Sequence, residues 1–160
     1  MEKLLKRVYS SKKISMALKI ISHASALICV AIFISTLVFL YIESPKQCVK
    51  TVFAAGIPFV LVSVIRKLIG APRPYELYGF YEVKPKEKTG QSFPSRHVFS
   101  AFIIAVLAIP VSVWLGAVAL VMGASLAVAR VLLGMHFIRD VAAGALAGVV
   151  CGVLGVIILI

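Results

Sequence analysis

Residues 130–140 read Arg130-Val-Leu-Leu-Gly-Met-His136-Phe-Ile-Arg-Asp140 and place three ionisable residue types between two long apolar runs. His136 and Asp140 are four residues apart, so on a helix they share one face. A carboxylate beside an imidazole can accept its N–H, which fixes the tautomer and leaves the other nitrogen free to attack. Arg130 is a fixed positive charge whose planar donors suit phosphate. The stretch therefore predicts a phosphate site where two helices meet.

The composition indicates a membrane protein. The chain has 160 residues, of which 61% are hydrophobic, and its mean hydropathy is +1.06, whereas soluble domains are about 45–50% apolar. Its net charge of +11 suits nucleic acid, anionic lipid or an anionic substrate. Nucleic acid is the weakest of these partners, because the sequence lacks aromatic residues interleaved with basic ones on a soluble face.

The three cysteines, Cys29, Cys48 and Cys151, lie far apart in the sequence, and two of them are inside apolar runs. Cys-x-x-Cys and Cys/His ligand spacings are both missing, so the sequence predicts neither a zinc site nor a disulfide framework. We expect the cysteines to be small buried hydrophobic residues.

The apolar runs predict an all-α fold, a single membrane domain over residues 1–160 with about five transmembrane helices. These spans cover roughly the following ranges: 14–42, 48–69, 97–109, 111–133 and 138–160. Residues 1–13 place Leu4, Leu5 and Val8 at helical spacing among lysines, which predicts a short amphipathic helix on anionic headgroups. Residues 71–96 contain the only long polar stretch and predict an interfacial loop whose tyrosines suit the headgroup zone.

The last predicted span carries a stripe of small residues, Gly144, Gly148 and Gly152. Such a stripe lets another helix approach closely. It predicts tight helix packing and could join two copies of the chain as a homo-oligomer.

Five spans would bring separate polar segments to one face of the membrane. The ends of the second and fourth spans and the starts of the third and fifth lie on the same side. Eight polar side chains are expected to meet there: Arg66, Arg73, Ser95, Arg96, His97, Arg130, His136 and Asp140. A transporter or channel would instead need charged residues midway through its spans.

Two of these polar segments have ordinary explanations when each is considered alone. Arg66 and Lys67 lie in the last turn of a helix, where cations suit the helix dipole, and could be a basic flank of a span. Ser95 is an expected N-cap, and the N–H groups that follow it form an anion site. His97 in the next turn could donate a proton to a leaving oxygen, although it could also be an interfacial histidine.

Taken together, the three segments resemble the type-2 phosphatidic acid phosphatase superfamily, membrane lipid phosphatases related in fold to vanadium haloperoxidases. That family shows the motifs K-x6-R-P, P-S-G-H and S-R-x5-H-x3-D. The chain matches them in order: Arg66-x6-Arg73-Pro74, Pro94-Ser95-Arg96-His97 and Ala129-Arg130-x5-His136-x3-Asp140. The chain departs from the family pattern with Arg66 for lysine, Arg96 for glycine and Ala129 for serine.

The resemblance implies a two-step hydrolysis of a lipid phosphomonoester or diphosphate without metal or cofactor. In the hydrolysis that the resemblance implies, His136 attacks phosphorus to form a phosphohistidine. Asp140 orients His136, and His97 protonates the leaving oxygen. The residues implied to hold the phosphate oxygens are Arg66, Lys67, Arg73, Ser95, Arg96 and Arg130. Phosphatidic acid, phosphatidylglycerol phosphate and undecaprenyl diphosphate all fit such a site at a bilayer surface.

Two alternatives stay open at the level of sequence. Because of Arg96 and Ala129, the chain could be a catalytically inactive scaffold or lipid-phosphate-binding membrane protein. All basic residues except Lys46 and Lys50 lie on the site face or in the N-terminal tail, so the positive-inside rule puts the site in the cytoplasm. Bacterial members of the family more often work on the outer side. The expected location is the bacterial plasma membrane, with several passes.

Overall fold

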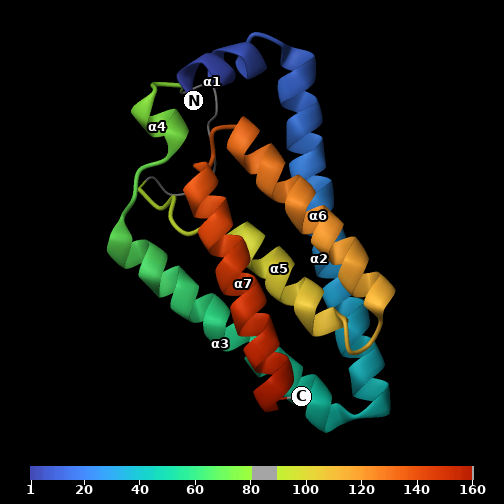
Figure 1. Ribbon diagram of the computed structural model, residues 1–160. Coiled ribbons are helices and arrows are strands. Elements are labelled where there is room, and N and C mark those ends of the chain that lie inside the picture. The colour runs from blue at the N-terminus through green and yellow to red at the C-terminus, as the bar shows by residue number, and fades with distance from the viewer. Residues whose placement is uncertain (81–89, 160) are drawn as a thin grey trace.

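The computed structural model describes residues 1–80 and 90–159, and within these ranges every regular element is a helix. Four long helices, α2 (Lys12–Glu43), α3 (Pro45–Ile69), α6 (Val113–Leu132) and α7 (Ile138–Leu159), surround the shorter α5 (Arg96–Ala108). Figure 1 shows these helices packed side by side at different tilts, with α1 (Glu2–Tyr9) and α4 (Pro74–Leu77) at one end of the bundle. The predicted all-α bundle is confirmed.

The helices differ in whether they can cross a bilayer. In the described chain, four segments are long and apolar enough to do so. Helix α5 has 13 residues, which at about 1.5 Å per residue gives about 20 Å, less than the hydrocarbon core of about 30 Å. Most of its residues are buried by the other helices: Val98, Phe99, Ala101, Ile103, Ile104, Ala105, Leu107 and Ala108. The chain is thus a multi-pass bundle built around a short central helix.

Helix α5 is held closely by the glycine stripe of α7. A Cβ atom added at Gly144 would lie 2.6 Å from the carbonyl oxygen of Ser95, and one at Gly148 would lie 2.6 Å from that of Phe99. The tight helix packing that the stripe predicts is therefore made within the chain. A homo-oligomer through the same stripe would have to displace α5.

The N-terminal helix α1 forms as predicted, and its apolar side packs against the bundle. Leu5 and Val8 are buried, and a Cβ atom at Gly134 would lie only 2.6 Å from a methyl carbon of Leu5. The Tyr9 hydroxyl donates a hydrogen bond to the Leu133 carbonyl oxygen at 2.9 Å. This helix therefore supports the loop between α6 and α7.

The predicted loop 71–96 contains one short helix, α4, and an anchor at Glu76. Its carboxylate accepts hydrogen bonds from the backbone N–H groups of Arg73, at 3.1 Å, and Gly90, at 3.2 Å. The Tyr75 N–H donates to the carbonyl oxygen of Gly134 at 3.1 Å. These bonds fasten the loop to the end of the bundle. The predicted interfacial residues Tyr81, Lys84, Lys86, Glu87 and Lys88 lie outside the described residues.

Candidate active site

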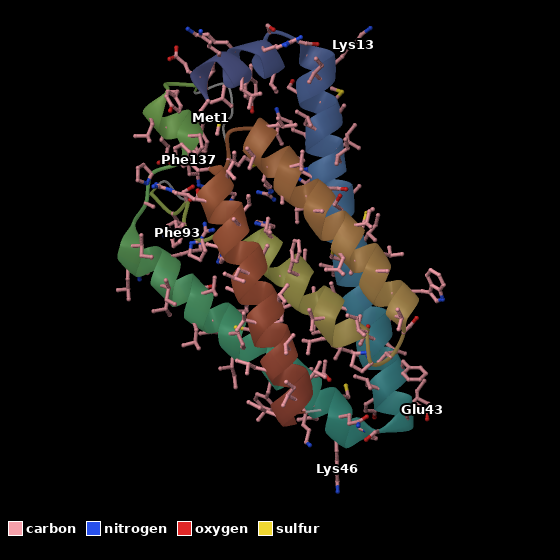
Figure 2. The ribbon with its side chains drawn as sticks, viewed as in Figure 1. Met1, Lys13, Glu43, Lys46, Phe93 and Phe137 are labelled. Atoms are coloured by element: carbon pink, nitrogen blue, oxygen red, sulfur yellow. The ribbon has the colours of Figure 1, made fainter. Side chains whose placement is uncertain are left out.

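The polar segments converge at one end of the bundle. Phe93 and Phe137, which flank two of them, lie toward the same end, opposite Glu43 and Lys46 (Figure 2). Six of the predicted site residues are almost fully buried there: Arg66, Arg73, Ser95, Arg130, His136 and Asp140. Among the buried charged residues that the structure describes, three are arginines and one is a carboxylate. This excess of positive charge favours an anion.

His136 lies between two helices, as the predicted spans place it, so it does not share a helix face with Asp140. Helix α6 ends at Leu132, Gly134 adopts a left-handed φ of +67°, and α7 begins only at Ile138. Glycine tolerates this conformation, which ends helices. Asp140 then caps α7, because its Oδ2 atom accepts the Phe137 N–H at 2.9 Å.

A serine that the sequence analysis did not assign joins the two residues. The His136 Nδ1 atom is 3.8 Å from Asp140 Oδ2, which is too long for a hydrogen bond. Ser92 Oγ donates to Asp140 Oδ2 at 2.5 Å and lies 3.5 Å from His136 Nδ1. Because its proton goes to Asp140, Ser92 can accept the Nδ1–H of His136 and leave the lone pair on Nε2.

The surroundings of His136 favour a neutral imidazole. Burial lowers the pKa of His136 below its ordinary value of 6.5, and the charges of Arg73, Arg66 and Arg130 lower the pKa further. The nearby Asp140 carboxylate favours the protonated ring and so raises the pKa of His136, but it does not reverse the net lowering. The Nε2 atom is buried and has no hydrogen-bond partner in residues 1–80 and 90–159. A neutral imidazole with an unoccupied nitrogen is the form needed for nucleophilic attack.

Backbone carbonyl groups fix the arginines of the cluster. Arg66 Nη1 donates to the Pro94 carbonyl oxygen at 2.9 Å. Arg66 and Arg73 both donate to the Gln91 carbonyl oxygen, Arg73 at 3.4 Å. Arg130 Nη1 reaches the sulfur of Met135 at 3.5 Å, beside His136. Arg66 and Arg73 therefore join the first polar segment to the second, and the Ser92–Asp140 hydrogen bond joins the second to the third.

Ser95 begins α5 as predicted, but its side chain makes no cap hydrogen bond. The Ser95 N–H donates to the Asp140 carbonyl oxygen at 3.0 Å, and its buried hydroxyl has no hydrogen-bond partner among the described residues. The hydroxyl and the first amides of α5 can therefore bind an anion.

Three other predicted residues lie outside the buried cluster. Lys67 is exposed at the end of α3. Arg96 and His97 are half-buried and line a cavity of about 240 Å³, with the Arg96 guanidinium 5.9 Å from the centre of the Phe59 ring. The other residues that line the cavity are mostly apolar: Ala26, Cys29, Val30, Ser100, Ala101, Ile104 and Leu126. His97 thus faces a mostly apolar space among α2, α3, α5 and α6.

Within residues 1–80 and 90–159, no group of three or more His, Cys, Asp or Glu side chains lies close enough together to hold a metal ion. The three cysteines are not bonded to each other; Cys29 is buried, and Cys48 and Cys151 are half-buried. Cys29 packs against Ala101 and Leu126.

A family model described as the PAP2 superfamily matches residues 47–159. The fold is similar to that of the first transmembrane PAP2 type phosphatidylglycerolphosphate phosphatase from Bacillus subtilis, with a TM-score of 0.73 and 18% identity over 96% of this chain and 81% of that chain. It is also similar to LpxE from Aquifex aeolicus, with a TM-score of 0.66 and 21% identity over 96% and 93%. No curated protein matches the sequence. At these identities the two structures show a shared fold.

Proposed function

Because the chain belongs to the PAP2 superfamily, we propose that it is a membrane lipid phosphatase with His136 as its nucleophile. The observation that carries this proposal is the buried His136 Nε2 atom beside three buried arginines. Such an arrangement suits phosphoryl transfer, in which positioning and charge stabilisation supply most of the catalysis.

In the first step, Nε2 of His136 attacks phosphorus and a P–N bond forms. The P–O bond to the leaving group breaks, and its electron pair stays on the leaving oxygen, which takes a proton from His97. Asp140 and Ser92 hold the Nδ1 side of the ring and stabilise the positive charge that develops there. The products of this step are a phosphohistidine and the dephosphorylated lipid.

In the second step, water attacks phosphorus and the P–N bond breaks. His97, now neutral, takes a proton from this water, so that inorganic phosphate leaves and both histidines return to their starting forms. During both steps Arg66, Arg73 and Arg130, with the Ser95 hydroxyl and the first amides of α5, stabilise the charge on the phosphate oxygens. This cluster supplies the positive charge that a metal ion would provide, so the reaction is expected to proceed without metal.

The substrate in this proposal is a lipid phosphate that enters from the bilayer. The site lies at one end of the apolar helices, so the phosphate can reach the cluster while the tails stay in hydrocarbon. Phosphatidic acid, phosphatidylglycerol phosphate and undecaprenyl diphosphate satisfy this requirement. The corresponding location is the bacterial plasma membrane.

The position of Arg96 weighs against an inactive scaffold. The Arg96 side chain lies over Phe59 in a cavity that is not lined by His136, so it does not fill the phosphate cluster. Ala129 removes a hydroxyl but no proton-transfer group.

Phosphate release from a panel of the three lipid classes, in detergent with EDTA, tests the proposal. Wild-type protein is expected to release phosphate, and His136→Ala to lose on the order of a thousandfold or more of kcat/KM. The matched control is His23→Ala, since His23 is an exposed histidine on α2 whose Nδ1 lies 2.7 Å from the Lys19 carbonyl oxygen. Full activity in a folded His136→Ala variant would contradict the assignment.

A further inference from the structure

Arg96 occupies the position at which the family motif has glycine, and its side chain enters the cavity among α2, α3, α5 and α6. Its guanidinium lies 5.9 Å from the centre of the Phe59 ring on α3. No carboxylate of residues 1–80 and 90–159 lies within ion-pair distance of it. A half-buried cation held by an aromatic ring keeps its guanidinium donors available, because the ring face attracts the charge without accepting all of its N–H groups.

Besides Arg96, the cavity is lined by one imidazole, that of His97, and by the thiol of Cys29. His97 is the residue proposed to protonate the leaving oxygen, so the cavity receives the leaving group. In the proposed function the reacting phosphate is bound by His136 and the buried arginines, and these residues do not line the cavity. Arg96 is therefore placed beside the leaving group and away from the reacting phosphate.

We infer that Arg96 is a specificity-determining residue that binds a second phosphate adjacent to the scissile one. The chain would accordingly prefer lipid diphosphates over lipid monophosphates. This inference rests on the proposed function and narrows its substrate class.

The chemistry of diphosphate cleavage explains the preference. When His136 attacks the terminal phosphorus, the bridging P–O bond breaks and its electron pair goes to the lipid monophosphate that leaves. The leaving phosphate therefore gains negative charge in the transition state, and Arg96 can stabilise it through paired N–H donors. A monophosphate whose leaving group is an alcohol offers no such anion to Arg96.

Farnesyl monophosphate and farnesyl diphosphate test the inference, since they share one tail and differ only in the second phosphate. Phosphate release is measured for both in the same detergent with EDTA. Wild-type protein is expected to have the higher kcat/KM with the diphosphate. The ratio of the two kcat/KM values should fall on the order of tenfold in Arg96→Gly, which restores the family residue, and much less in Arg96→Lys, which keeps the charge.

Phe59→Leu provides a second test that leaves Arg96 in place. Removing the ring takes away the support of the guanidinium, so the ratio should fall by a smaller factor than in Arg96→Gly. Size-exclusion chromatography of each variant checks that it is folded and monodisperse.

The outcomes are distinct. An unchanged ratio in active Arg96→Gly protein would overturn the inference and leave the proposed function standing. Equal losses with both substrates would also overturn it, since Arg96 would then act on the reacting phosphate or on the fold. Absence of release from every substrate by folded wild-type protein would contradict the proposed function, and the inference would fall with it.

Discussion

The molecule surrounds arginine in two different ways. In the buried cluster, Arg66 and Arg73 are almost fully enclosed and their donors are fixed by backbone carbonyl groups. In the cavity, Arg96 is half-buried and its guanidinium lies over the Phe59 ring. Hydrogen-bond donors held in fixed positions suit the reacting phosphate, which every substrate has. A guanidinium that can adjust its position suits a second phosphate, which only some substrates have. In the proposed function, the buried cluster therefore serves catalysis and the cavity serves selection among substrates.

The largest effect should come from the buried cluster. Arg73→Met is expected to lower kcat/KM on the order of a hundredfold, about 3 kcal/mol, because one fixed donor of the transition-state charge is lost. The loss should be the same for farnesyl monophosphate and diphosphate, in contrast to Arg96→Gly. Arg7→Met, which removes an exposed arginine of α1, is the control. A strong change in the ratio of kcat/KM for the diphosphate to kcat/KM for the monophosphate in Arg73→Met would contradict the assignment of different roles to the two regions.

The next effect concerns the packing that separates the two regions. A Cβ atom at Gly144 would meet the Ser95 carbonyl oxygen at 2.6 Å, so Gly144→Ala should push the start of α5 away from α7. Overpacking of this kind costs about 1–3 kcal/mol of stability. Thermal unfolding in detergent should show a lowered midpoint, and both substrates should lose activity. Gly56→Ala is the matched control, because nothing lies within 4 Å of its added Cβ atom; equal behaviour of the two variants would contradict the packing account.

A smaller effect is expected from Ser92, the link between Asp140 and His136. Ser92→Ala should lower kcat on the order of tenfold, because the imidazole loses part of its orientation while Asp140 remains in place. KM should change less than kcat, and Ser92→Thr should restore part of the rate. Steady-state kinetics with one farnesyl substrate measure kcat and KM separately. A change confined to KM would show that Ser92 does not position the nucleophile.

The smallest effect is a shift in protonation. Since burial and the arginines lower the pKa of His136, its ring should stay neutral at pH 7 and take up a proton only below pH 6.5. Attack by Nε2 should therefore weaken as the pH falls through this lowered pKa. Removing a positive charge in Arg130→Gln should raise the pKa, and Asp140→Asn should lower it. NMR of ¹³C-labelled histidine, assigned by the signal lost in His136→Ala, measures these shifts; a wild-type pKa above 6.5 would contradict the proposed environment.

Much of the architecture could be predicted because apolar runs and topology constrain it. The helix boundaries fall close to the predicted spans, and five segments running back and forth bring separate motifs to one end of the bundle. The details that escaped prediction depend on contacts distant in sequence. Whether His136 is helical depends on Gly134 and on the support that Leu5 gives to it. The sequence around Ser92 does not distinguish an ordinary loop serine from one that hydrogen-bonds a residue beside the nucleophile.

The sequence predicts which segments form the site better than it predicts which side chains of those segments face the buried cluster. Lys67 and Arg66 are neighbours in the last turn of α3, yet one is exposed and the other buried, because successive helical side chains point about 100° apart. Arg96 and Ser95 diverge in the same way at the start of α5. Sequence spacing gives the segment, and the packing of the bundle decides which of its residues face the cluster.

Detection of a phosphoryl group on His136 would identify this residue as the nucleophile. His97→Ala lacks the group that activates water, so with farnesyl diphosphate, whose leaving group needs little protonation, it should accumulate the covalent intermediate. Intact-mass analysis after a rapid quench at high pH, followed by peptide mapping, should find one phosphoryl group on the peptide that contains His136, and none in a variant that also carries His136→Ala. Turnover by wild-type protein together with no adduct on His136 in the His97→Ala protein, or with an adduct on another residue, would contradict the account.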